Sequence, residues 1–151
     1  MSDTSYNERN RREYLRMRAL IDRLSDDDLR RRVNEHWTVA AYLLHVGFWD
    51  ARNRWLSDKQ RSGAAFTESD IEPDDVTWIN ESMRPFLHAI PPRDAARLAL
   101  RLAEAADEGV ASPPAGGWWP ENEKSLVNPV RAEHRAEHLD QIEDALKATS
   151  R

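Results

Sequence analysis

Residues 36–50 read HWTVAAYLLHVGFWD, and this stretch decides the fold class of the chain. Thr38 is a suitable N-cap, because its hydroxyl can accept a hydrogen bond from a free backbone N–H at a helix start. The residues after it are apolar on almost every side of a helical wheel, which is typical of a helix buried among others. We therefore expect residues 38–56 to form the central helix of an all-α protein.

The composition of the whole chain favours the same fold class. Of its 151 residues, 40% are hydrophobic and 32% are charged, which is typical of a globular protein. There are only five glycines, and the helix-favouring residues Ala, Leu, Arg and Glu are abundant. The length matches one ordinary domain, so we expect residues 1–151 to form a single helical domain.

Hydrophobic residues recur at helical spacing in other segments on either side of the central helix. Pro73 suits the first turn of one of these segments, because a proline lacks only an N–H that has no helical partner there. Pro91 and Pro92 separate that segment from the next one. The helices expected beside the central one cover residues 6–24, 74–89, 94–110 and 129–147, with a short turn at 25–33.

Residues 112–128 form a long irregular stretch that contains the pair Trp118 and Trp119. Loops of this length are uncommon in compact domains and are often functional. The tryptophans therefore either line a pocket or plug one end of the helices, and both interpretations stay open.

Charge and residue usage exclude several classes of protein. The formal net charge is −5, and acidic and basic residues alternate, so the basic face that nucleic-acid binding needs is missing. There is no cysteine, which excludes disulfides and thiolate metal ligands. The first twelve residues are polar, and the most apolar run, residues 39–49, is too short to span a bilayer. We expect a cytoplasmic protein that binds neither nucleic acid nor membrane.

His134 and His138 lie four residues apart in the last expected helix, so their rings project from the same face. That face also carries Ile142, whereas Arg131 and Arg135 fall on other faces of the helix. The histidine pair is therefore expected to point into the protein, where the two rings could share one metal ion.

His45 lies on the buried central helix, where a single histidine is more often a hydrogen-bonded core residue than a metal ligand. The His134 and His138 pair in the same small core makes metal ligation by His45 more favourable, since one metal ion would give all three rings a partner. Three imidazoles leave one coordination position open, as in catalytic zinc sites, and imidazole also suits nickel, copper and iron.

Three motifs in this order resemble the DinB-like superfamily of metal-binding four-helix bundles. They are residues 37–45 (WTVAAYLLH), the following Trp49-Asp50, and the closing His134-x-x-x-His138. Residues 75–81 and the alanine pair at 95–96 are similar to the mycothiol-dependent maleylpyruvate isomerase-like branch.

This resemblance implies a four-helix bundle of up-down-down-up topology, with a long crossover at residues 57–93 between its second and third helices. It also implies that His45, His134 and His138 are the metal ligands, with zinc or nickel as the expected ion.

The expected function is that of a metal-dependent enzyme acting on a small molecule. A low-molecular-weight thiol such as mycothiol, bacillithiol or glutathione would serve as co-substrate in an S-transferase or isomerase reaction, and a bound water would serve in a hydrolase. A metal-dependent protein that binds a small molecule without catalysis and a bundle with a structural metal are the alternatives. Apolar faces on the helices at 6–24 and 94–110 leave a homodimer open.

Two charged residues are candidate catalytic groups. Arg52 lies two turns after His45 on the same face and could hold an anionic part of the substrate, although an arginine whose stem covers apolar surface is the commoner case. Glu137 lies near the histidine face and could act as a base or orient a ligand. A surface ion pair of Glu137 with Arg131 or Arg135 is the alternative.

Overall fold

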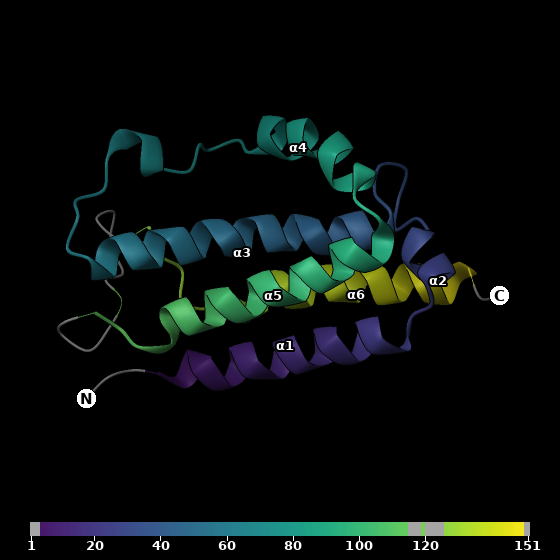
Figure 1. Ribbon diagram of the computed structural model, residues 1–151, viewed down its shortest axis with the longest axis horizontal. Coiled ribbons are helices and arrows are strands. Elements are labelled where there is room, and N and C mark those ends of the chain that lie inside the picture. The colour runs from purple at the N-terminus through teal and green to yellow at the C-terminus, as the bar shows by residue number, and fades with distance from the viewer. Residues whose placement is uncertain (1–3, 115–118, 120–125, 150–151) are drawn as a thin grey trace.

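The computed structural model describes residues 4–114, 119 and 126–149, and the regular elements of these residues are helices, with no strand among them. In Figure 1 the long helices lie side by side, and a shorter helix lies on their outside. The prediction of an all-α fold is confirmed. The elements are α1 (Ser5–Arg23), α2 (Asp26–Arg30), α3 (Val39–Arg61), the 3-10 turn η1 (Glu68–Asp70), α4 (Thr77–Ala89), α5 (Pro92–Ala111) and α6 (Ala132–Thr149).

Helix α3 is the central helix that residues 36–50 predict. Thr38 is its N-cap, and the Thr38 hydroxyl accepts a hydrogen bond from the backbone N–H of Ala41 at 3.2 Å. The first turns of α3 are buried on all sides, whereas its last turns reach Arg61, five residues beyond the expected end at 56. The extension is stabilised by the C-terminal end of α5, because Arg61 donates to the carbonyl of Gly109 and, at 2.8 Å, to that of the C-cap residue Ser112.

Helices α3 and α5 make the most extensive contact in the protein. Small residues explain the close approach: a Cβ on Gly47 of α3 would lie only 3.1 Å from a side chain and 3.3 Å from the backbone of α5. The facing side of α5 is a stripe of alanines that are completely buried. The apolar faces of α1 and α5 lie in this core with α3 and α6. The alanine stripe consists of Ala95, Ala96, Ala99, Ala103 and Ala106.

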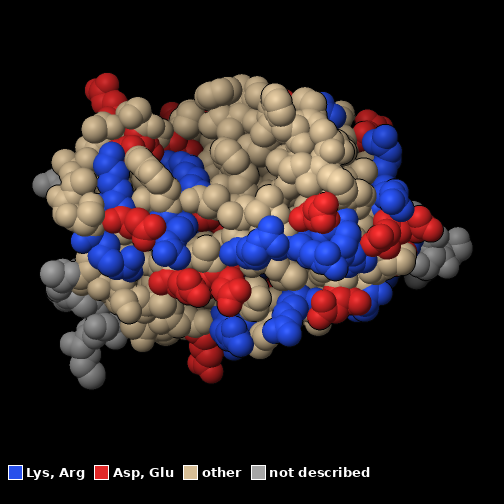
Figure 2. Space-filling view, viewed as in Figure 1, with Lys and Arg blue, Asp and Glu red and all other residues tan. Residues whose placement is uncertain are grey.

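Helix α4 covers the outside of α3 and contributes no buried residue. It begins at Thr77 and not in the turn of Pro73, because the Asp75 carboxylate accepts the backbone N–H of Thr77 at 2.9 Å. Trp78 and Phe86 of α4 are exposed to 63% and 74%. The face shown in Figure 2 has a broad uncharged area where Figure 1 places α4, and mixed acidic and basic side chains below it.

The start of α6 is set by a residue of α1. Asn10 is 1% exposed, its Oδ1 accepts the N–H of Ala132 at 2.9 Å, and its Nδ2 donates to the carbonyl of Pro129 at 2.9 Å. The helix therefore begins at Ala132, three residues after the start at Pro129 that the sequence predicts. None of the described helices combines the length and the apolarity that crossing a bilayer requires.

Candidate metal centre

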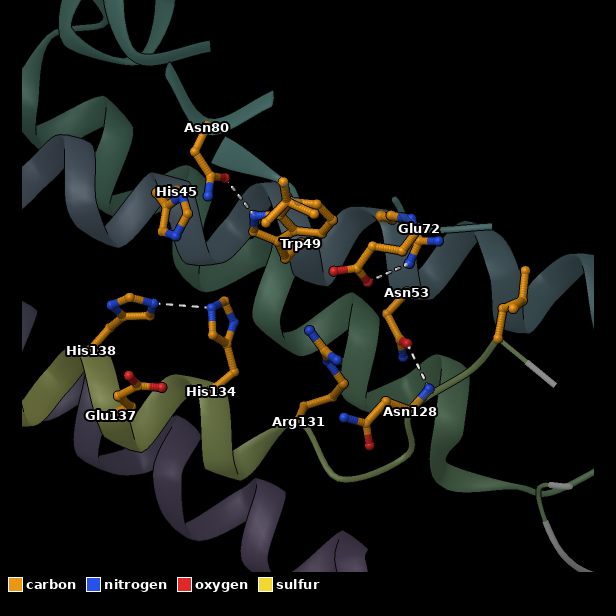
Figure 3. Close-up of a pocket in the computed structure, with 13 residues that line it drawn as sticks. His45, Trp49, Asn53, Glu72, Asn80, Asn128, Arg131, His134, Glu137 and His138 are labelled. Atoms are coloured by element: carbon orange, nitrogen blue, oxygen red, sulfur yellow. Dashed lines mark hydrogen bonds and ion pairs between the residues drawn. The ribbon is translucent and has the colours of Figure 1, made fainter. Parts of the chain in front are cut away.

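The three predicted ligand histidines lie together between α3 and α6 (Figure 3). One ring nitrogen from each of His45, His134 and His138 lies within 4.8 Å of the other two. The Nε2 atoms of His134 and His138 are 3.0 Å apart. The His45 ring centroid lies 5.1 Å from that of His138 and 5.9 Å from that of His134. These residues could hold one metal ion.

Burial keeps these imidazoles neutral. Loss of hydration lowers the pKa of His45 to about 4 and that of His134 to about 3, and neighbouring positive charge acts in the same direction. Burial also lowers the pKa of His138. Neutral rings at neutral pH have free lone pairs for metal coordination. The Nδ1 of His45 is buried and has no hydrogen-bond partner among the described residues, which fits a histidine that binds a further ligand.

The orientation of His138 is fixed by a hydrogen-bond chain that the sequence did not reveal. Its Nδ1 lies 3.0 Å from the Oε1 of Gln141, one turn later on α6, and the Tyr42 hydroxyl donates to the same oxygen. Because Oε1 only accepts, Nδ1 carries the proton and Nε2 faces His134 with its lone pair. The Tyr42 ring stacks on His45 and meets His138 edge-on. Gln141 shares the histidine face, and that spacing is the signal that could have identified it.

The histidines border a cavity of about 390 Å³. Its walls come from α3, from the connection between α3 and α5, from the segment before α6 and from α6 itself. A site with a cavity beside it has room for a small molecule next to the ion position. The lining residues are His45, Trp49, Arg52, Asn53, Glu72, Val76, Asn80, Leu126, Asn128, Arg131, His134, Glu137 and His138.

Both candidate catalytic residues line this cavity. Arg52 is engaged with the connection that follows α3: its Nη2 donates to the carbonyl of Asp70 at 2.7 Å, and its Nη1 lies 3.6 Å from the Glu72 carboxylate. Its guanidinium also lies over the Trp49 ring, 5.9 Å from the centroid. Glu137 is exposed at the edge of the cavity, one residue before His138.

Arg131 and Arg135, which the helical wheel places on other faces than the histidines, are both buried. Arg131 Nε lies 3.0 Å from one oxygen of Asp50, and Arg135 Nη2 lies 3.5 Å from the other. Arg135 also forms two hydrogen bonds with Asp107, at 3.0 and 3.1 Å. Carboxylates on α3 and α5 thus supply the counter-charges that hold both arginines inside, in place of the surface pair with Glu137.

Asn53 is a cavity residue that the sequence interpretation missed. His45, Trp49 and Asn53 follow one another every four residues on α3, and all three line the cavity. Asn53 is 3% exposed, and its Oδ1 accepts the backbone N–H of Asn128 at 3.0 Å. The spacing from His45 is the signal that could have found it.

The two interpretations of the tryptophan pair are resolved for one member only. Trp119 is 4% exposed, and its Nε1 lies 3.0 Å from the Val110 carbonyl and 3.2 Å from the Tyr6 hydroxyl. It plugs the end of the bundle where α1 begins and α5 ends, away from the histidines. Trp118 lies outside the described residues.

Comparisons with protein-family models, with curated proteins and with solved structures find no match to this chain.

Proposed function

We propose that this chain is a metal-dependent enzyme of the DinB-like superfamily whose His45, His134 and His138 hold one divalent ion. The observation that carries the proposal is the convergence of three neutral imidazoles, from two helices far apart in sequence, at the wall of a cavity. Imidazole ligands suit zinc or nickel, which are the ions we propose.

The ligand set favours a catalytic ion over a structural one. Structural zinc sites are closed by four protein ligands, whereas three histidines leave a position for water or substrate. A dication held by neutral ligands acts as a Lewis acid and lowers the pKa of a bound water or thiol. We propose that Glu137, which is exposed beside His138 at the edge of the cavity, accepts the released proton.

We propose a small thiol as co-substrate, in an S-transferase or isomerase reaction, with hydrolysis as the corresponding reaction of water. The cavity supports an enzyme or a small-molecule binder over a bundle that is merely stapled by metal. We also propose the up-down-down-up order for α1, α3, α5 and α6. The long connection at residues 62–91 and the course of the colours along these helices in Figure 1 support it.

The metal content of protein purified without a histidine tag tests the proposal. We expect about one zinc or nickel ion per chain, with loss of the metal in a His45→Ala variant. His36→Ala is the matched control, since His36 is exposed and is not among the three clustered rings. Metal far below one per chain in the unmodified protein would overturn the site.

A second measurement separates the reaction types. Cobalt(II) is substituted at the site, and its near-ultraviolet and visible absorption spectrum is recorded with a panel of small thiols. A thiol that enters the open position adds a sulfur-to-metal charge-transfer band. If no thiol changes the spectrum, the transferase and isomerase assignments fail and a hydrolase or a binder is left.

A further inference from the structure

Asn53 has a hydrogen-bond donor that nothing in the described part of the chain uses. Its side chain is buried, and its Oδ1 is occupied by the backbone N–H of Asn128 at 3.0 Å. Its Nδ2 has no hydrogen-bond partner, although the residue lines the cavity beside the histidines. A buried amide N–H without a partner is unfavourable, so this buried donor, on a residue that borders the cavity, points to a ligand that accepts from it.

Arg131 presents further donors to the same cavity. Its side chain is only 7% exposed, and Asp50 takes its Nε at 3.0 Å. No hydrogen bond joins its two Nη groups to another described residue, and in Figure 3 the side chain is seen between His134 and Asn53. Because Asp50 is itself held by Arg135 on its second oxygen, the Arg131 guanidinium is fixed in orientation with its outer edge free.

The charges around these donors favour an anion with a single negative charge. Asp50 and Asp107 balance Arg131 and Arg135, and the histidine side chains contribute no negative charge, so a bound dication would keep its full charge. The carboxylate of Glu137 also borders the cavity and would repel a ligand of higher negative charge. The remaining walls include the apolar side chains of Trp49, Val76 and Leu126.

We propose that the Arg131 guanidinium and the Asn53 amide form a carboxylate-binding subsite, and that the substrate is a small monocarboxylic acid with an apolar body. The two Nη groups of an arginine match the two oxygens of a carboxylate, and Asn53 adds a third donor. The inference rests on the proposed function, because the subsite positions the rest of the acid beside the three histidines. Arg52 is not this anion-binding group, since its guanidinium is occupied by Asp70 and Glu72.

Binding of benzoate, compared with its neutral isostere benzamide, tests the subsite by titration calorimetry on the metal-loaded protein. We expect benzoate to bind at least about tenfold more tightly than benzamide. Asn53→Asp keeps the acceptor for Asn128 and replaces the free donor by a negative oxygen, so benzoate affinity should fall roughly 10- to 100-fold. Asn80→Asp is the matched control, because it adds the same charge to the same cavity. Asn80 accepts a hydrogen bond from Trp49 at 3.1 Å, and its replacement should change benzoate affinity less than about threefold.

Arg131→Lys provides a second variant in case Asn53→Asp does not fold. It keeps a positive charge opposite Asp50 and loses the planar pair of Nη donors, so the preference for benzoate over benzamide should shrink about tenfold. Equal affinity for benzoate and benzamide in the unmodified protein, or equal losses in Asn53→Asp and Asn80→Asp, would overturn the subsite.

The metal content of each titrated sample distinguishes this inference from the proposed function. If metal is present and benzoate is not preferred, the subsite fails and the metal centre stands. If metal is absent, the proposed function fails, and the same titration with the two Asn variants still decides whether the donors bind a carboxylate.

Discussion

Replacing Asp50 by asparagine removes the negative charge between two buried arginines while it keeps the shape of the side chain. Asp50 is 1% exposed, and the side chains of Arg131 and Arg135 are 7% and 1% exposed, so water cannot compensate the lost charge. Removal of one partner of a buried ion pair typically costs about 3–5 kcal/mol of unfolding free energy. The amide oxygen that asparagine retains can still accept a hydrogen bond from Arg131. We therefore expect a loss of unfolding free energy at the lower end of this range, about 3 kcal/mol.

For a chain of this length, a loss of about 3 kcal/mol lowers the melting temperature by roughly 6–12 °C. Urea unfolding at neutral pH, followed by circular dichroism, measures the free energy directly. Asp27→Asn is the matched control, because Asp27 pairs with Arg30 at 3.1 Å on the surface, where the two side chains are 96% and 58% exposed. That change should cost less than about 1 kcal/mol. Equal small losses in both variants would refute the conclusion that the arginines depend on Asp50 inside the protein.

The metal-free protein should lose stability as the pH falls from 6.5 toward 4. The unfolded chain protonates its histidines near pH 6.5, whereas folding lowers the pKa of His45 to about 4 and that of His134 to about 3, so the unfolded state binds more protons in this range. Each histidine contributes up to about 1.4 kcal/mol per pH unit, and urea unfolding at a series of pH values should show a shallower dependence in His45→Gln. Gln141→Leu removes the acceptor that orients His138 and should weaken metal affinity roughly 10- to 100-fold in competition with a chelator, with the fold retained. Gly47→Val places a side chain where α5 lies 3.1–3.3 Å away and should cost about 1–3 kcal/mol, and a melting temperature equal to that of the unmodified protein would contradict the close packing.

Local regularities of the sequence were sufficient for the helices and for part of the candidate site. The 3.6-residue period places His134 and His138 on one face, and the apolar run after Thr38 identifies α3 as the buried helix. Ser25, whose hydroxyl accepts from the backbone N–H of Asp28, is likewise of a residue type that favours helix caps. Such features depend on neighbours within one or two turns, so residue order alone contains them.

Which polar groups are buried was decided by the tertiary structure. On a helical wheel, Arg131 and Arg135 belong to other faces than the histidines, yet Asp50 and Asp107 from other helices turn them inward. The first turn of α6 likewise depends on Asn10, which lies more than a hundred residues earlier. Burial of a charge or an amide is favourable only when distant segments supply its partner, and the period of one helix carries no information about that partner. The sequence by itself therefore determined an all-helical chain with an inward histidine pair. The packing of α3 against α6 decided that His45 lies beside His134 and His138, and that Asn53 and Arg131 border the same cavity.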